Sequence, residues 1–282
     1  MTAAILHTIT PTQHDLGGLW VRRALPSPGI GMVGPFIFVD MFGPAELPAG
    51  RAMDITPHPH IGISTVTWLF EGAIHHRDSI GTDAIIRPGQ VNLMTAGRGI
   101  THSERSPEDL RCKVQPIWGM QTWLALPDGL EEMAPAFEQQ QVLPVFEEHG
   151  ARATVIMGNL WGKQAPTTCH CPTIYADIAL SAGGEIAIEP SATERAVMLV
   201  SGGASLQEEP LQLYGLHLLA AGEELRLHSD HGARVMLMGG EPLYTPRFIW
   251  WNFVASSQER IRQATRDWQE GRFPAVPGDP DT

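Results

Sequence analysis

Short apolar runs that stop at glycine or proline turns recur along the first half of the chain. Residues 65–70 are Thr-Val-Thr-Trp-Leu-Phe and stop at Glu71-Gly72, and the apolar residues 91–95 are followed by Ala96-Gly97. Runs of about 4–8 residues at spacings of roughly ten, without a helical pattern between them, are typical of a β-sandwich or barrel. The other strands expected in this half are residues 18–23, 34–40, 84–87 and 117–126.

The strand pattern stops near residue 127 and resumes from Arg152. Residues 127–144 are rich in Glu, Gln and Pro with few β-branched residues, so we expect a connector over 131–150 with room for one helical turn. The later strands are expected at residues 154–157, 173–180, 196–200, 216–220, 224–228 and 234–238. The chain therefore appears as two copies of one all-β architecture, residues 1–130 and 151–245.

Residues 246–282 form a final segment with a helical pattern. Ser256 followed by Glu259 fits a capping box at a helix start, and Gly271 fits the residue just past its end, before Pro274. Three apolar residues between them recur at helical spacing, Ile261, Ala264 and Trp268. We expect a helix that packs this stripe back on the barrels.

Length and charge narrow the function classes. The 282 residues suit two medium domains, and a hydrophobic fraction of 43% is ordinary for a globular protein. The net charge of −12 repels phosphate backbones, so we expect no direct binding of nucleic acid. Partners are then a small molecule or another protein.

The expected compartment is reducing. The chain has three cysteines, a low and odd number that argues against a disulfide framework. The first eleven residues lack a basic segment followed by an apolar one, and no run of about 18 apolar residues exists that would span a membrane. We expect a cytoplasmic protein without a membrane segment.

Two pairs of metal-binding residue types share one spacing. His58 and His60 stand in Pro-His-Pro-His at residues 57–60, and His102-Ser103-Glu104 repeats the spacing with an imidazole and a carboxylate. Side chains at i and i+2 of a strand point to the same face. Pro59 cannot donate to a sheet ladder, which places its segment at a strand start, an edge or a bulge.

On facing or adjacent strands, these pairs make a site of three imidazoles and one carboxylate. Such ligands suit iron, manganese, copper, nickel or zinc, and not calcium. All of them bind in the deprotonated form, so the metal affinity should fall in acid. Either pair alone is weak evidence, and exposed or hydrogen-bonded histidines without a metal are the alternative.

The same region resembles the pirin family. Residues 58–108 carry its central block, HPHIGISTVTWLFEGAIHHRDSIGTDAIIRPGQVNLMTAGRGITHSERSPE. The likeness extends to GPFIFVDMFGP at residues 34–44, to GGEPLYTPRF at residues 239–248, and to the closing helix with Gly271-Arg272-Phe273. It therefore covers nearly the whole chain.

Members of this family are bicupins, so the resemblance implies an all-β chain of two tandem cupin domains with a C-terminal α-helix. Each cupin is a jelly-roll-like β-barrel. The N-terminal cupin, within residues 1–130, is implied to bind one divalent transition metal through His58, His60, His102 and Glu104. We expect Fe(II), and Mn, Cu, Ni, Co and Zn remain alternatives.

The resemblance also implies an activity. Some pirin-like proteins are credited with quercetin 2,3-dioxygenase activity, which opens a flavonol ring and releases carbon monoxide. A small aromatic chelating substrate would then bind the metal, and Glu104 would be the base that takes the proton of the 3-hydroxyl. One alternative is a non-enzymatic redox-sensing metalloprotein that modulates a protein partner such as a transcriptional regulator. Another is a purely structural metal.

Some positions depart from the pattern. Ser64 stands where many relatives have a glutamate, which removes one candidate proton shuttle. The second half has no paired histidines, and His228 with Asp230 could not hold a metal tightly, so we expect a degenerate C-terminal cupin without metal. We expect His75-His76 outside the barrel, Cys169-His170-Cys171 in a loop with incidental thiols, and Gln121 on a strand that lines the pocket.

Overall fold

The computed structural model describes residues 3–15 and 19–281, and its regular secondary structure is almost wholly strand. Two compact units share the chain. The N-terminal unit comprises Gln13–Val21, Val39–Gln141 and Tyr244–Thr282, and the C-terminal unit comprises Met1–Thr12, Arg22–Phe38 and Val142–Leu243. The two units therefore interleave in the sequence, and the final segment belongs to the unit that contains the paired histidines.

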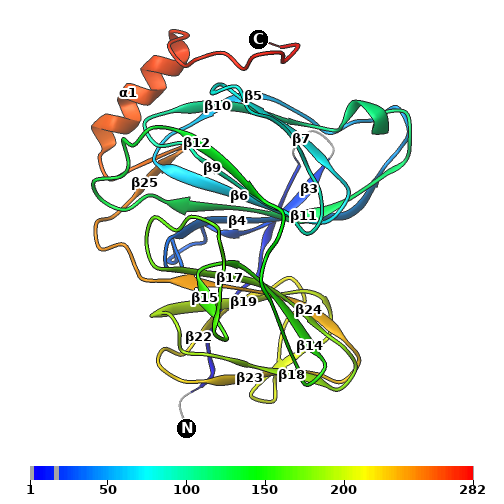
Figure 1. Ribbon diagram of the computed structural model, residues 1–282. Helices are drawn as coiled ribbons and strands as arrows, with labels where there is room; N and C mark the ends of the chain where they lie inside the picture. Colours follow the sequence, from blue (N-terminus) through cyan, green and yellow to red (C-terminus); the bar gives the residue numbers. More distant parts are fainter. Residues whose placement is uncertain (1–2, 16–18, 282) are drawn as a thin grey trace. The chain divides into compact units, whose positions relative to one another are not determined.

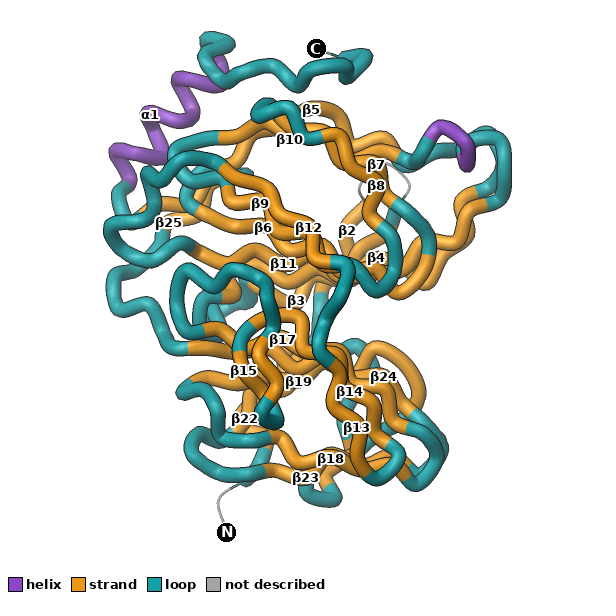
Figure 2. Tube along the Cα trace, viewed as in Figure 1, coloured by secondary structure: helices purple, strands orange, loops and turns teal. Residues whose placement is uncertain are grey.

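The N-terminal unit is built from two antiparallel sheets (Figures 1 and 2). The larger, in the order β12-β9-β6-β11-β4-β3-β2, contains β2 (Thr12–Asp15), β3 (Trp20–Leu25), β4 (Phe36–Leu47), β6 (Ile63–Glu71), β9 (Val91–Thr95), β11 (Gln115–Ala125) and β12 (Ala136–Gln140). The smaller, in the order β5-β10-β7-β8, contains β5 (Asp54–His60), β7 (Ile74–Asp78), β8 (Asp83–Ile86) and β10 (Ile100–Arg105). A 3₁₀ turn, η1 (Glu108–Leu110), follows β10.

Apolar side chains from both sheets meet in one core of this unit. Phe42 and Leu69 come from the larger sheet, while Ile74 and Ile86 come from the smaller one, and all four are buried in the same cluster. The alternation of side chains along each strand directs one set inward, which is why the apolar runs of the sequence become the walls of a barrel.

The C-terminal unit repeats this plan. Its larger sheet, in the order β1-β22-β19-β24-β17-β14-β13, contains β1 (Ile5–Ile9), β13 (Val145–Glu148), β14 (Ala151–Met157), β17 (Thr173–Leu180), β19 (Glu194–Gly202), β22 (Leu216–Leu219) and β24 (Ala233–Gly240). The smaller contains β18 (Gly184–Ile188), β20 (Ser205–Leu206), β21 (Glu209–Pro210) and β23 (Leu225–Ser229), and β15 (Asn159–Leu160) pairs with β16 (Lys163–Gln164). Buried residues such as Val197 of the larger sheet and Leu227 of the smaller share one core. The expected all-β fold of two cupins with a C-terminal helix is confirmed.

The segment 131–150, expected as a connector, contains two strands. β12 pairs with β9 at the edge of one large sheet, and β13 pairs with β14 at the edge of the other. No helical turn forms there; the chain passes from one unit to the other between Gln141 and Val142. Polar edge strands such as β12, Ala-Phe-Glu-Gln-Gln, lack the apolar alternation by which the inner strands are recognised.

The expected helix is present as α1 (Gln258–Gln269), drawn in orange beside β25 in Figure 1. Ile261 and Ala264 are buried against Phe253 of the hairpin β25 (Phe248–Trp250) and β26 (Phe253–Ala255). Gly271 follows the helix with φ 68°. The expected capping box is wrong: the helix begins after Ser257, and the Ser256 hydroxyl donates instead to Glu131.

Candidate metal centre

Three of the four residues expected to bind a metal come together in the N-terminal unit. His58, His60 and His102 each offer a ring nitrogen, and these atoms lie within 4.8 Å of one another. His60 and His102 are buried, at 1% exposure each, and His58 is partly buried. This cluster could hold a metal ion, as the chemistry of its ligands predicts.

Strand pairing produces the cluster. β10 lies between β5 and β7, and His102 is the direct partner of His58 in the antiparallel ladder with β5. The i, i+2 spacing then brings His60 to the same face as His58. A bulge interrupts the ladder between His102 and Glu104, where the register moves from His58 to Ile55. A bulge is expected there, because Pro57 and Pro59 cannot donate ladder hydrogen bonds.

Backbone carbonyls orient two of the three rings. The Nδ1 of His58 lies 2.9 Å from the Thr56 carbonyl oxygen, and the Nδ1 of His60 lies 3.2 Å from that of Asn252. A carbonyl only accepts, so both Nδ1 atoms carry the proton and both Nε2 atoms keep a lone pair. This is the tautomer that a metal-binding histidine needs.

The spacing of the ring nitrogens fits a shared ion. The Nε2 atoms of His60 and His102 are 3.1 Å apart. Two nitrogens each about 2.1 Å from one metal would be roughly 3.0 Å apart at a right angle and roughly 3.4 Å at the tetrahedral angle. The observed separation lies between these values, so these two donors suit a shared transition metal.

Burial keeps the cluster neutral. It lowers the pKa of His58 from 6.5 to about 4, and the nearby His76 adds to the effect. For His60 and His102, burial and then the charge of His58 lower the pKa well below the ordinary value. Neutral imidazoles are ready to bind a metal at neutral pH, since no proton has to leave first.

Glu104 lies outside the three-histidine cluster in the structure. Its carboxylate is buried and accepts hydrogen bonds from Gln121 Nε2, 3.2 Å from Oε1 and 3.4 Å from Oε2. The Thr67 hydroxyl donates to Gln121 Oε1 at 2.6 Å, which fixes the amide with its NH₂ toward Glu104. Burial raises the pKa of Glu104, although the Gln121 hydrogen bond opposes the rise.

His76 lies next to the cluster, although we expected it outside the barrel. It is 3% exposed, its ring stacks on Phe137, and its Nδ1 lies 3.4 Å from His102 Nδ1. Its Nε2 lies 3.2 Å from Asp78, which is fully buried. The neighbouring His75 pairs with the exposed Asp83. The alternation of a strand at residues 74–78 would have placed one of these histidines inside.

The other candidates are not part of the three-histidine cluster. The Ser64 hydroxyl is buried and hydrogen-bonds Thr95 Oγ1 at 2.9 Å. Cys169 and Cys171 lie in a loop, and their partly exposed thiols form hydrogen bonds with Thr167 and Thr173. In the C-terminal unit, His228 Nε2 is 3.9 Å from Asp230, and both side chains are substantially exposed.

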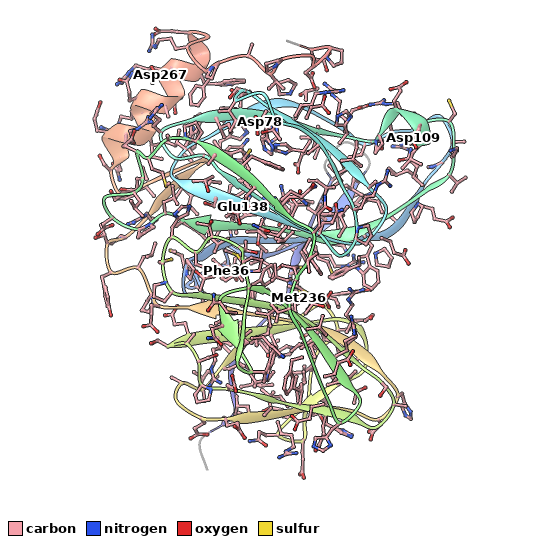
Figure 3. All side chains as sticks on the ribbon, in the orientation of Figure 1. Phe36, Asp78, Asp109, Glu138, Met236 and Asp267 are labelled. Atoms are coloured by element: carbon pink, nitrogen blue, oxygen red, sulfur yellow. The ribbon has the colours of Figure 1, made fainter. Side chains whose placement is uncertain are left out.

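Asp78 is held from several sides (labelled in Figure 3). Its Oδ1 accepts the backbone N–H groups of Ile80 and Thr82, each at 3.0 Å. Burial opposes its ionisation, but the hydrogen bonds from His76 and Thr82 outweigh it and lower the pKa of Asp78. Asp78 is therefore a fixed, ionised acceptor behind His76.

Comparison with known proteins assigns the family. The pirin family model matches residues 18–124, and the model of the pirin C-terminal cupin domain matches residues 175–274. A pirin-like protein of Caulobacter vibrioides is 43% identical over 264 residues, which cover 92% of this chain and 91% of the relative. A Pseudomonas aeruginosa protein named "Putative quercetin 2,3-dioxygenase" is 39% identical over 95% of this chain and 84% of its own.

Solved structures agree in fold. The crystal structure of a quercetin 2,3-dioxygenase from Acinetobacter baumannii has a TM-score of 0.91 and 35% identity, covering 98% of this chain and 92% of that one. The Escherichia coli pirin YhhW, solved with nickel(II), has a TM-score of 0.66 at 18% identity, over 84% of this chain and 99% of its own. Among the described residues, no helix is long and apolar enough to cross a membrane. The chain belongs to the pirin family.

Proposed function

We propose that this protein is a metal-dependent dioxygenase that opens flavonols of the quercetin type. One observation carries the proposal: three neutral imidazoles converge on one point in a buried part of a cupin. His58, His60 and His102 hold the metal, and Glu104 is the fourth ligand. The names of the Pseudomonas relative and of the Acinetobacter structure support the choice of substrate.

The metal is Fe(II) in this proposal, with Mn, Cu, Ni, Co and Zn as alternatives that the same ligands accept. A bound ion of this kind supplies a Lewis acid for the flavonol oxygen and an electronic path between the flavonol and oxygen. The three histidines set its position and leave room for other ligands. His58 is the least buried of the three, so the substrate approaches from its side.

Glu104 takes the proton of the flavonol 3-hydroxyl. The carboxylate becomes a neutral acid and the hydroxyl becomes an oxyanion, from which the ring opens on reaction with oxygen and loses carbon monoxide. Burial raises the pKa of Glu104 in the metal-free protein, which favours proton uptake by this carboxylate. Gln121 holds the carboxylate in place, and the Trp123 ring, 5.0 Å from that of His60, gives the site an apolar wall.

Metal content and oxygen uptake test the proposal. The purified protein is reconstituted with Fe(II), its metal is measured by plasma mass spectrometry, and oxygen uptake is followed on addition of quercetin. His58→Ala and Glu104→Ala are compared with His228→Ala, which removes a histidine of the C-terminal unit. We expect one metal per chain, with uptake, in the wild type and in His228→Ala. Both the metal affinity and the uptake should fall in the other two variants.

Two results would count against the dioxygenase. Bound metal without oxygen uptake would exclude quercetin as a substrate and favour the alternative, a redox-sensing protein that modulates a protein partner. Wild-type protein that binds no metal after reconstitution would exclude both, and family membership would then describe the fold alone.

A further inference from the structure

His102 differs from the other two histidines in what faces its Nδ1. Backbone carbonyls face the Nδ1 atoms of His58 and His60, so their tautomers are fixed. The Nδ1 of His102 faces a ring nitrogen, the Nδ1 of His76, at 3.4 Å. A neutral ring nitrogen either donates or accepts, so this contact alone permits two opposite arrangements of protons.

In the first arrangement, His102 carries its proton on Nδ1 and donates it to His76. Its Nε2 then keeps a lone pair directed at His60 Nε2, 3.1 Å away. In the second arrangement, His76 donates to His102, whose proton moves to Nε2. That proton would block the position where a metal must bind, since the nitrogen needs its lone pair for the ion.

Asp78 decides between the two arrangements. An ionised carboxylate accepts hydrogen bonds and donates none, so His76 Nε2, 3.2 Å from Asp78 Oδ2, must carry a proton. With a single ring proton, held on Nε2, His76 has no proton on Nδ1 and can only accept there. His102 must therefore carry its proton on Nδ1 and keep its Nε2 lone pair free.

The strands hold Asp78, His76 and His102 firmly in this hydrogen-bonded series, which we call the relay. Asp78 is the ladder partner of His102, and His76 is the ladder partner of Glu104, so β7 and β10 bring the residues together. Asp78 is 0% exposed, and its Oδ1 already accepts the N–H groups of Ile80 and Thr82. Its Oδ2 is thus left to face His76, which itself stacks on Phe137.

We propose that Asp78 and His76 form a positioning pair that fixes the tautomer of His102, so that its Nε2 lone pair faces the metal. The inference rests on the proposed metal site but not on its substrate. His76 and Asp78 do not touch the metal. They keep His102 ready for it, and the expected contribution of such outer partners is about 10–100-fold in metal affinity.

Asp78→Asn reverses the relay with almost no change of shape. The N–H groups of Ile80 and Thr82 keep the amide oxygen, so the amide NH₂ faces His76 Nε2 and turns it into an acceptor. His76 must then donate from Nδ1, and His102 must carry its proton on Nε2. The matched control is Asp83→Asn. Asp83 lies on β8 and accepts a hydrogen bond from His75, which precedes His76 on β7 and faces the more exposed side of that strand.

Two measurements read the outcome, and neither needs substrate. ¹⁵N NMR of the histidine rings in the metal-free protein reports which nitrogen of His102 carries the proton, and competition with a chromophoric chelator gives the Zn(II) dissociation constant. We expect the proton on Nδ1 in the wild type and in Asp83→Asn, and on Nε2 in Asp78→Asn. The Zn(II) dissociation constant should rise about 10–100-fold in Asp78→Asn alone.

A second pair of variants protects the test against misfolding of Asp78→Asn. His76→Phe keeps a ring on Phe137 but removes the acceptor, whereas His76→Asn places an amide oxygen near the former Nδ1. We expect His76→Asn to bind Zn(II) more tightly than His76→Phe, and equal affinities would contradict the proposal. So would Asp78→Asn with wild-type affinity and the proton still on His102 Nδ1. A wild type that binds no Zn(II) would instead refute the metal site, and the NMR of the metal-free protein would still decide the tautomer.

Discussion

His60 Nε2 lies 3.1 Å from His102 Nε2, although 42 residues separate them in the chain. With both rings protonated on Nδ1, the two Nε2 lone pairs face each other and repel in the metal-free protein. A metal ion would remove this repulsion, because it accepts the lone pairs of both nitrogens. The arrangement of the cluster therefore favours a bound ion.

Metal binding should withstand mild acid. The pKa of His58 is lowered from 6.5 to about 4 by burial, and those of His60 and His102 are lowered well below their ordinary value. Protons compete with the metal only below these pKa values, so affinity should be nearly constant from pH 8 to about 6 and fall steeply toward pH 4. Zn(II) titrations across this range give the midpoint.

A short peptide with exposed histidines is the control for that titration. Exposed imidazoles take up protons near pH 6.5, so the peptide should lose Zn(II) at a higher pH than the protein does. Loss of metal from the protein centred at pH 6.5 or above would show that the histidines are not held neutral by burial.

Glu104→Gln should separate proton transfer from metal binding. The amide keeps the size of the side chain but cannot act as a base, so oxygen uptake with quercetin should fall about 10²–10⁴-fold. The three histidines should still retain Fe(II), with a lower affinity. Uptake close to that of the wild type would exclude Glu104 as the base.

Gln121→Leu tests how the base is held. The hydrogen bond from Gln121 lowers the pKa of Glu104 against the effect of burial. Its loss should raise that pKa further, so the acid limb of the pH profile of kcat/KM should move to higher pH. Thr67→Val, which frees the Gln121 amide without removing it, should move the limb in the same direction by less. A limb that stays fixed in Gln121→Leu would contradict this role.

The inner strands and the spacing that brings His58 and His60 together could be predicted from the sequence, because both follow from short-range pattern. The run 65–70 lies within β6, and residues 173–180 coincide with β17. The period of two along a strand places His58 and His60 on one face, and the pairing of β5 with β10 adds His102.

The sequence did not predict the features that depend on contacts between residues far apart in the chain. β1, Ile-Leu-His-Thr-Ile, pairs with β22, which lies more than 200 residues away in the sequence, and no local pattern predicts that contact. His76 was misplaced because its strand, Ile-His-His-Arg-Asp, lacks the apolar alternation that would identify a strand. Glu259 is closer to Ser256 in the sequence, but the Ser256 hydroxyl donates its hydrogen bond to Glu131 instead.

Arg105 should anchor the C-terminal tail. Its guanidinium binds Asp279 through Nε and Nη2, at 2.8 and 2.7 Å, and also reaches Asp281 and Asp54. Asp279 is buried, and the Arg105 guanidinium holds its pKa well below the usual range. The pair therefore stabilises the fold at neutral pH and loses this effect only in strong acid, as Asp279 becomes protonated.

Asp279→Asn should lower the free energy of unfolding by about 1.5–3 kcal/mol, the usual range for a buried hydrogen bond to a charged group. Urea unfolding followed by tryptophan fluorescence measures the change. Glu185→Gln is the control, because it breaks the exposed ion pair with Arg226 and should change stability by less than about 1 kcal/mol. Equal effects of the two variants would show that the tail is not held by Arg105.

Gly62→Ala should damage both the fold and the metal site. Gly62 has φ 69°, and a Cβ there would lie 2.0 Å from the Val254 carbonyl oxygen. The left-handed backbone alone costs a residue with a side chain about 1–2 kcal/mol, and the clash must also push β26 away from β5. Asn252, two residues before Val254, accepts the hydrogen bond from His60 Nδ1, so the same movement should release the ring of His60.

Gly89→Ala separates the two effects. Gly89 has φ 81°, but a Cβ there meets nothing within 4 Å, so this variant carries the backbone strain without the clash. We expect Gly89→Ala to lose about 1–2 kcal/mol of stability and to bind Zn(II) as the wild type does. Gly62→Ala should lose more stability and bind Zn(II) more weakly. If both variants bind Zn(II) equally well, the Asn252 carbonyl does not hold His60 for the metal, and the backbone contact would be structural only.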